Sequence, residues 1–208
     1  MLTILAVTAV AYFLGSLPAG YIAGRIAGVD IRTLGSGNVG ATNVTRMLGK
    51  RFGYPVFLVD FAKGVTAAVL SRTIAKHNQL DADLIDLCVA TVGVAAVIGH
   101  SFPVWLGFKG GKGVATSIGV LFGIEWTVAL IIGGVWLVVF QISRYVSLAS
   151  IAAVVALPLT MIALFWLNRL NSPVLLYFSL CLTAIVIFRH RSNLSRLCKG
   201  TEPRFTRK

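Results

Sequence analysis

The chain has 208 residues, of which 57% are hydrophobic and only 12% charged, whereas roughly 25% of the residues in an ordinary soluble domain are charged. This composition excludes a soluble globular domain and favours one integral membrane domain over residues 1–208. Lys and Arg outnumber Asp and Glu by 19 to 7. In a soluble protein such an excess suggests binding to nucleic acid, whereas in a membrane protein it reflects the orientation of the spans and the binding of anionic ligands. No nucleic-acid partner is therefore expected.

Apolar stretches recur along the whole chain, and a helix needs about 20 apolar residues to cross a hydrocarbon core of roughly 30 Å. No basic region precedes the first stretch, so we expect a membrane span there and not a cleaved signal peptide. The charge at Glu125 leaves one question open, because residues 114–142 form either one long tilted helix or two short helices that turn at this residue. The expected spans lie at residues 2–24, 53–71, 84–106, 114–124, 126–142, 146–167 and 173–188.

The distribution of positive charge predicts the orientation of these spans. With seven spans and the N-terminus outside, 15 of the 19 Lys and Arg residues fall on one side, which the positive-inside tendency identifies as the cytoplasm. Six spans would place either the loop 25–52 or the basic tail 189–208 on the wrong side. The sequence therefore predicts an all-α, polytopic integral membrane protein with seven transmembrane helices, its N-terminus outside and its C-terminus cytoplasmic.

The first polar loop, residues 32–46, reads RTLGSGNVGATNVTR. Glycines let backbone N–H groups approach an anion closely, and Asn, Ser and Thr add neutral hydrogen bonds. A flexible linker between two spans is the plainer interpretation, but the order of glycines and asparagines before Arg46 is richer than a linker requires. We expect substrate contacts here from Ser36, Gly37, Asn38, Gly40, Thr42 and Asn43.

Inside the next span, Asp60 and Lys63 lie three residues apart and can form a pair across one helical turn. Charges within a span are costly unless they are paired or face a cavity. The pair is therefore either a structural link between helices or part of the wall of a polar site.

A second polar segment, residues 99–116, reads GHSFPVWLGFKGGKGVAT and leads into an apolar stretch. Lys109 and Lys112 flank the pair Gly110–Gly111, an arrangement that resembles a phosphate-binding loop at the start of a helix. The alternative is a cytoplasmic turn whose lysines meet lipid headgroups. The segment lacks the Walker A pattern, so nucleotide hydrolysis is not expected.

Two further cytoplasmic segments carry polar residues. In the short corner QISRYVS, Ser143 and Arg144 are either ligands of an anion or parts of a plain connection. The tail begins RHRSNLSRLCKGTEPRF, and His190 and Asn193 share one face if the last helix continues for a turn. The three cysteines have neither CxxC spacing nor a partner histidine at ligand intervals, so neither a disulfide, a metal nor another cofactor is expected.

These residues resemble a known family, the bacterial acyl-phosphate:glycerol-3-phosphate acyltransferases called PlsY. The resemblance is carried by GSGNVGATNVTR, DFAKG, GHSFPVWLGFKGGKGVAT, SRYVSLASI and HRSNLSRLCKGTE, in this order, from about Leu34 to Glu202. It implies transfer of a fatty acyl group from acyl phosphate to the sn-1 hydroxyl of glycerol-3-phosphate, which gives lysophosphatidic acid and inorganic phosphate in bacterial phospholipid synthesis. It also implies a multi-pass protein of the cytoplasmic (inner) membrane, in contact with membrane lipid and with the enzyme that makes acyl phosphate.

An acyl phosphate has a good leaving group, so positioning and charge stabilisation suffice for direct transfer. The residues expected to act in catalysis are Arg46, Lys109, Lys112, His190 and Asn193. The resemblance favours acyl phosphate at the first loop and glycerol-3-phosphate among the basic side chains, an assignment that spacing alone leaves open. The general base is His190, His100 or a phosphate oxygen of a substrate.

Two other functions fit part of the pattern. A transporter for a phosphate-bearing solute would need polar residues along a continuous path through the membrane, but the charges expected inside the spans are confined to Asp60 and Lys63. A lipid-binding scaffold would need the basic tail but not the Gly- and Asn-rich loop. A site on one face of the membrane is the better interpretation.

Overall fold

The structure is a computed structural model that describes residues 2–170 and 172–205, and this part of the chain is built from helices. The longer helices are α1 (Leu2–Ser16), α4 (Lys50–His77), α5 (Ala82–Ser101), α7 (Trp126–Ser143), α8 (Val146–Trp166) and α9 (Pro173–Arg189). The short elements are α2 (Ala19–Ile26), η1 (Ile31–Thr33), α3 (Ala41–Leu48), η2 (Val104–Leu106), α6 (Val114–Ile124) and α10 (Arg191–Cys198). The predicted all-α class is confirmed.

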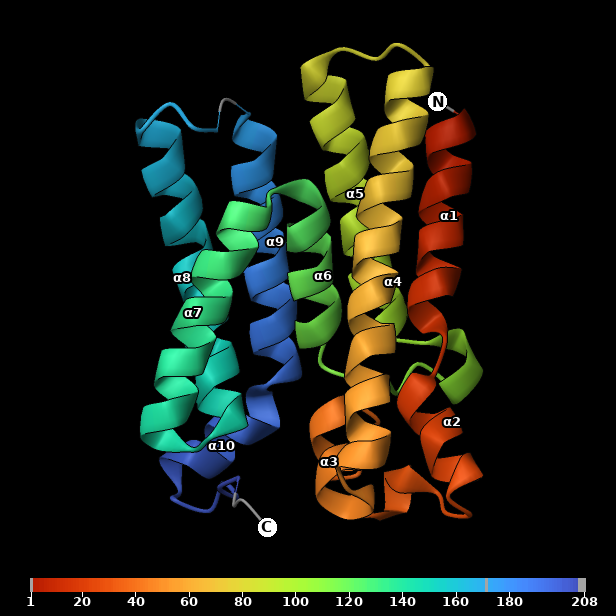
Figure 1. Cartoon of the computed structure of the whole chain (residues 1–208), viewed down its shortest axis with the longest axis vertical. Coiled ribbons are helices and arrows are strands. Elements are labelled where there is room, and N and C mark those ends of the chain that lie inside the picture. The colour runs from red at the N-terminus through yellow and green to blue at the C-terminus, as the bar shows by residue number, and fades with distance from the viewer. Residues whose placement is uncertain (1, 171, 206–208) are drawn as a thin grey trace.

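The long helices run along the long axis of the molecule, which is vertical in Figure 1. The N-terminal end of α1 lies at the upper end of the view, and α10 lies at the lower end. The connection between α7 and α8, helices α2 and α3, and helix α10 gather toward the lower end. These are segments that the charge pattern assigns to one side of the membrane, so the chain does bring them to one end of the bundle.

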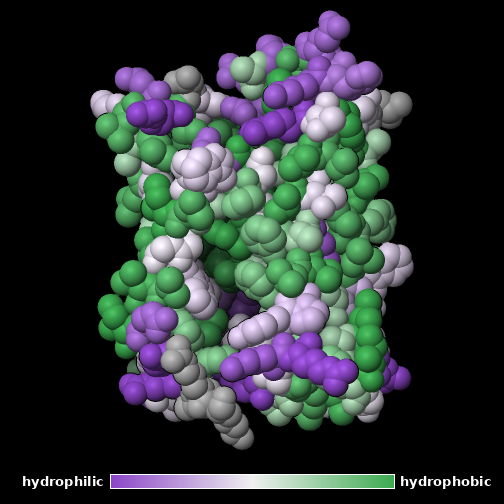
Figure 2. All heavy atoms as spheres, viewed as in Figure 1, coloured by the Kyte–Doolittle hydropathy of each residue, from purple (hydrophilic) through white to green (hydrophobic). Residues whose placement is uncertain are grey.

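Among the residues that the structure describes, five segments are long and apolar enough to span a membrane: Thr3–Ile26, Lys50–His77, Ala82–Leu106, Trp126–Ser143 and Val146–Trp166. A sixth is obtained if α9 and α10, which are bent by 61° relative to each other, count as one span. Helix α6 has 11 residues, and at 1.5 Å per residue it rises only about 16 Å, roughly half a hydrocarbon core. The number of seven full crossings therefore stays a prediction. Figure 2 shows an apolar belt between hydrophilic ends, as a membrane protein requires.

One expected span is broken in the structure, at Leu17–Pro18, where α1 ends and α2 begins. Pro18 has no N–H to donate to the helical ladder, and the carbonyl of Leu17 accepts a hydrogen bond from Lys63. The open question at Glu125 is also answered, because its Oε1 accepts hydrogen bonds from the N–H and hydroxyl of Thr127 at 3.3 and 2.5 Å. Residues 114–142 thus form two short helices, α6 and α7, which run antiparallel in Figure 1.

Close packing of α6 against α4 depends on two glycines that face each other across the helix pair. A Cβ atom at Gly64 would lie 2.1 Å from the carbonyl oxygen of Thr116, and one at Gly119 would lie 2.1 Å from that of Phe61. Small residues at such contacts are typical of membrane helices, which associate through close backbone approach. The contact fixes α6 beside α4, and with it the polar segment that precedes α6.

Candidate active site

A cavity of about 570 Å³ lies among the first loop, α3, α4, α6, α7, α8, α10 and the tail. In Figure 2 the surface is hollowed between the part of the molecule that holds α7 and the part that holds α3 and α4. Its polar lining includes Ser36, Asn38, Thr42, Thr45, Arg46, Lys112, Ser117, Ser147, His190, Asn193, Arg196 and Glu202. Its apolar lining includes Leu121, Ile132, Trp136, Phe140, Ala153, Val154, Leu157 and Val186. The cavity is suited to a ligand with a charged head and an apolar chain.

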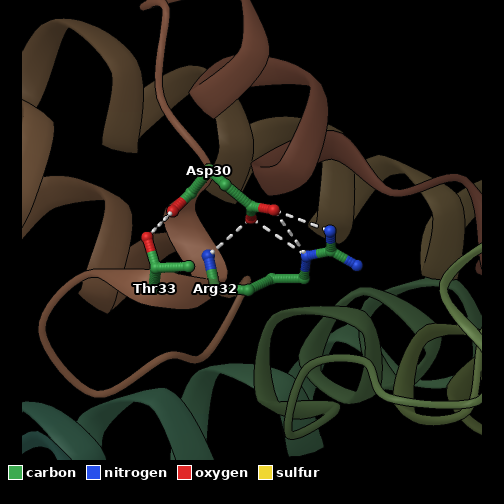
Figure 3. A network of polar contacts seen from close by, with 3 residues as sticks. All are labelled: Asp30, Arg32 and Thr33. Atoms are coloured by element: carbon green, nitrogen blue, oxygen red, sulfur yellow. Dashed lines mark hydrogen bonds and ion pairs between the residues drawn. The ribbon is translucent and has the colours of Figure 1, made fainter.

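The chain enters the first loop through a polar network of Asp30, Arg32 and Thr33 (Figure 3). Arg32 donates its backbone N–H to Asp30 Oδ1 at 3.0 Å and pairs with Oδ2 through Nη2 at 2.6 Å. Hydrogen bonds from Arg32 lower the pKa of Asp30 to about 2, and the guanidinium also lies 4.8 Å from the ring centroid of Tyr21. Arg32 is therefore engaged outside the cavity and shapes the loop from there.

Two asparagines give the first loop its conformation. The buried Asn43 accepts a hydrogen bond from the N–H of Ser36 at 3.0 Å and donates to the carbonyl of Leu34 at 3.0 Å. Asn38 accepts from the N–H of Gly40 at 2.8 Å. These three hydrogen bonds lie within the loop and the start of α3, and they hold both segments at the cavity.

Several helix N-termini line the cavity. Gly40 to Thr42 start α3, Gly113 to Ala115 start α6, and Val146 with Ser147 start α8. The first N–H groups of a helix have no partner within the helix, and the helix dipole places partial positive charge there. Their convergence favours an anion such as phosphate without requiring a metal ion.

Three basic side chains reinforce this preference: Arg46, Lys112 and Arg196 line the cavity. Burial lowers the pKa of Lys112 to about 8; the carboxylate of Glu202 opposes the shift, and nearby arginines, including Arg196 and Arg46, add to it. Positive charges that lie close together in a half-buried site repel one another, and an anionic ligand offsets this repulsion. The polar end of the cavity is therefore suited to an anion.

The three polar segments of the sequence meet at the pair Gly110–Gly111. Arg189 donates from Nη2 to the carbonyl of Gly110 at 2.8 Å and from Nε to that of Gly111 at 3.0 Å. Asn38 from the first loop also donates to Gly110, at 3.4 Å. A Cβ atom at Gly110 would lie 2.2 Å from the backbone carbonyl oxygen of His100, so only glycine fits at that position. The pair joins the segments and does not line the cavity.

His190 lies at the bend between α9 and α10, is 2% exposed and lines the cavity. Its Nδ1 donates to the carbonyl of Val186 at 2.8 Å, which leaves Nε2 as the acceptor of the neutral ring. Burial lowers the pKa of His190 to about 4, against the opposing effect of this hydrogen bond, and the charge of Lys112 contributes. The ring is neutral near pH 7, so it suits a hydroxyl better than a phosphate.

Asn193 is buried beside His190 and has one free acceptor. Its Nδ2 donates to Oε1 of Glu202 at 2.7 Å, and its Oδ1 has no hydrogen-bond partner within residues 2–170 and 172–205. A buried polar atom that lines a cavity and has no partner is suited to a ligand group. Asn193 and His190 thus present two acceptors, although the last helix bends here where the sequence suggested that it continues.

The tail after α10 folds back over the polar end of the cavity. Glu202 accepts hydrogen bonds from Ser147 Oγ at 2.6 Å and from Arg196 Nε at 2.8 Å. Burial acts to raise the pKa of Glu202, but its hydrogen bonds from Ser147, Asn193 and Arg196 prevail and lower it. The N–H of Phe205 donates to the carbonyl of Arg144 at 2.8 Å. The carboxylate links α8, α10 and the tail into one wall.

The expected pairing of Asp60 with Lys63 is confirmed at 2.7 Å, and both residues are buried. Lys63 also donates to the carbonyl of Leu17 at the break between α1 and α2. On the other side, His100 Nδ1 lies 3.4 Å from Asp60 Oδ1, and Asp60 and His100 line the cavity. The pair is both a link between helices and part of the wall.

The structure brings nine of the expected site residues to the cavity: Ser36, Asn38, Gly40, Thr42, Asn43, Arg46, Lys112, His190 and Asn193. Six others do not line it: Gly37, Lys109, Gly110, Gly111, Ser143 and Arg144. Lys109 is exposed. Ser143 accepts from the N–H of Tyr145 at 3.2 Å, and Arg144 holds the tail through its carbonyl. The roles of these six in binding stay predictions.

Sequence reasoning missed several polar residues of the cavity. They are Thr45, Ser117, Ser147, Ser150, Arg196 and Glu202. Some of these lie within segments already singled out, and the helical spacing of Ser147 and Ser150 after the corner at Arg144 was an available signal. Within the described part of the chain, no group of three or more His, Cys, Asp and Glu residues is placed to hold a metal ion.

The chain is similar to known proteins along most of its length. The family model described as glycerol-3-phosphate acyltransferase matches residues 5–200. The glycerol-3-phosphate acyltransferase of Prochlorococcus marinus (strain NATL2A) is 48% identical over 194 residues, 93% of each chain, and that of Aquifex aeolicus (strain VF5) is 45% identical over 196 residues, 94% of this chain and 95% of its own.

Two solved structures are also similar. They are the glycerol 3-phosphate form and the lysophosphatidic acid form of PlsY (YgiH), an integral membrane glycerol 3-phosphate acyltransferase, with TM-scores of 0.87 and 0.84. Each is 43% identical to this chain, and the match covers 98% of this chain and 96% of theirs.

Proposed function

The chain belongs to the glycerol-3-phosphate acyltransferase family, as an integral membrane enzyme of the PlsY type, and from that premise we propose that acyl phosphate is its acyl donor and the sn-1 hydroxyl of glycerol-3-phosphate its acceptor. The products are lysophosphatidic acid and inorganic phosphate. The observation that carries the proposal is the two-ended cavity, whose cations and helix N-termini lie at one end and whose apolar side chains lie at the other.

Both substrates carry phosphate, and one also carries a fatty chain, so one cavity with these two ends accommodates both. The acyl phosphate lies with its phosphate at the first loop and the start of α3, and with its chain among the apolar residues of α6, α7 and α8. Glycerol-3-phosphate lies against Arg46, Lys112 and Arg196, and Lys112 also faces the donor phosphate. Asn193 Oδ1 and His190 Nε2 remain to accept hydrogen bonds from the glycerol hydroxyls.

Transfer is direct. The sn-1 oxygen attacks the acyl carbonyl carbon, an ester bond forms, and the bond between that carbon and the phosphate oxygen breaks. The hydroxyl proton passes to His190 Nε2 or to a phosphate oxygen, and the electron pair leaves with phosphate. Lys112 and the helix N-termini stabilise the charge on the departing phosphate, which is the type of electrostatic contribution that dominates many enzymatic accelerations.

The lower end of the bundle in Figure 1, which holds α2, α3 and α10, is the cytoplasmic end in this proposal. The positive-inside tendency supports it, because 15 of 19 Lys and Arg residues fall in the segments assigned to that side. The enzyme then lies in the bacterial cytoplasmic membrane, and its donor arrives from the enzyme that makes acyl phosphate.

A donor comparison tests the proposal. Purified protein in lipid vesicles is given glycerol-3-phosphate with hexadecanoyl phosphate, with hexadecanoyl-CoA, or with no donor, and lysophosphatidic acid and phosphate are both measured. We expect product with acyl phosphate alone, with one phosphate released per ester formed. Product from acyl-CoA at a comparable rate would contradict the choice of donor. Phosphate release without glycerol-3-phosphate would indicate a hydrolase.

A further inference from the structure

The apolar part of the cavity is a slot that runs along three helices. On α8, the lining residues progress from Ser147, which contacts the tail through Glu202, to Leu157 ten residues later. At 1.5 Å per residue this is about 15 Å. On α7 the lining runs in the opposite direction, from Phe140, whose ring lies 6.0 Å from that of Phe205 in the tail, to Ile132.

The far end of the slot is closed. Leu121 of α6, Ile132 of α7 and Leu157 of α8 are the lining residues farthest from the polar end on their helices, and they are 2%, 5% and 1% exposed. Beyond them α6 ends at Ile124, and the chain turns at Glu125 into α7. Ile124 and Val128, on either side of this turn, are buried in the same core cluster as the three end residues, so the α6–α7 turn closes this end of the slot.

The length of the slot is that of one lipid chain. A hydrocarbon core of roughly 30 Å is filled by the chains of two leaflets, so one leaflet accounts for about 15 Å. A closed slot of this length accepts a chain up to a limit, and each methylene that it buries contributes about fourfold in affinity. A chain that is too long has to leave methylenes outside or push the end wall apart.

One residue near the closed end keeps space open. Gly133 lines the cavity, and a Cβ atom built on it meets no other atom within 4 Å. The next residue, Gly134, also has no atom within 4 Å of its Cβ position, but it is exposed and does not line the cavity. The two glycines lie side by side on α7 and differ in whether a larger side chain would enter the slot.

We propose that the end wall of Leu121, Ile132 and Leu157, with the space at Gly133, sets the longest acyl chain that this enzyme transfers. The inference rests on the proposed function, because it takes the slot to hold the acyl chain of the donor. It assigns these residues as determinants of chain-length specificity, a property distinct from the handling of phosphate at the other end.

The test compares Gly133→Leu with the matched control Gly134→Leu, using dodecanoyl and hexadecanoyl phosphates as donors. A leucine that displaces two methylenes of the longer chain lowers kcat/KM for hexadecanoyl relative to dodecanoyl phosphate by about fifteenfold. Gly134→Leu should leave this ratio at the wild-type value. The enlarging variant Leu157→Ala should shift the ratio in the opposite direction, toward chains longer than the wild-type optimum.

A binding measurement separates this inference from the proposed function. Thermal stabilisation of each variant by lysophosphatidic acids with 12 and 16 carbons reports occupancy of the slot without requiring any donor. Suppose that wild-type protein does not use acyl phosphate but the chain-length ratio in binding still changes only in Gly133→Leu and Leu157→Ala. The proposed donor is then wrong, but the assignment of the slot to an acyl chain is supported. Equal ratios in wild type and Gly133→Leu, with both proteins folded, would overturn the slot.

Discussion

Replacement of Lys112 by Arg separates a lysine that grips phosphate from one that only marks the cytoplasmic side. Lys112 lines the cavity, and burial lowers its pKa to about 8, whereas Lys109 is exposed and does not line it. Arg keeps the charge but brings a wider planar head that does not reproduce the point contact of an ammonium. Lys112→Arg should therefore insert normally and lose activity, whereas Lys109→Arg should insert normally and keep it.

The size of the loss follows from Coulomb's law. At an effective dielectric constant of about 20, moving the positive charge from about 4 to about 5 Å from a phosphate lowers the attraction by about 0.8 kcal/mol per unit charge. For a dianion the loss is about 1.7 kcal/mol, which is a factor of roughly fifteen to twenty in kcat/KM.

Steady-state kinetics of the two single variants in vesicles, with membrane insertion checked by protease protection, would measure it. A higher KM for glycerol-3-phosphate with unchanged kcat would mark a contact made equally in the ground and transition states. Wild-type kinetics in a correctly inserted Lys112→Arg protein would refute the reasoning and move the phosphate site onto Arg46 and Arg196.

Further outcomes follow from the same geometry. Lys112 loses its charge as the pH rises past its pKa of about 8, so kcat/KM for glycerol-3-phosphate should fall above pH 8. The residual activity of Lys112→Arg should lack that decline, and a pH profile of both proteins checks this. Glu202→Gln removes the charge that Ser147, Asn193 and Arg196 bind, so a thermal melt should show a lower Tm and kinetics a higher KM, and unchanged values of both would count against the tail as a wall. Activity should persist in chelator, and a loss that magnesium restores would contradict the metal-free site. Single cysteines can be placed at the exposed positions Arg51, Lys109 and Lys199 in a protein without the three native cysteines. Each should resist an impermeant thiol reagent in intact cells, and labelling of any one from outside would contradict a shared cytoplasmic face.

The fold could largely be predicted because its helices follow from long apolar stretches. The two breaks were harder to place. Pro18 stands in an apolar stretch that reads as continuous, and α1 ends just before it, but Pro55 and Pro158 lie inside α4 and α8. A proline therefore does not by itself show where a helix breaks. At Glu125 the sequence left two alternatives, and the side chain decides between them by capping α7 through Thr127. Hydropathy reports how apolar a segment is, but not where a cap ends it.

The cavity lining could be predicted in part where a residue type had a chemical reason to meet phosphate: Lys112 and Arg46 line the cavity, whereas Lys109 does not. It could not be predicted where a residue acts through the backbone. Gly110 and Gly111 have the composition of an anion loop, but their carbonyls accept from Arg189, and His100 packs where a side chain would stand. Glu202 was missed because its partners come together only when the tail folds back.

A structure of this chain with a non-hydrolysable acyl phosphonate tests the central claim most directly, because it shows where both ends of the donor lie. We predict the phosphonate among the first loop, the N-terminus of α3 and Lys112, with the chain lying along α8 toward Leu157 and the carbonyl carbon facing His190 and Asn193. A phosphonate bound away from this polar end, or a chain lying outside the slot on the lipid-facing surface, would contradict the account.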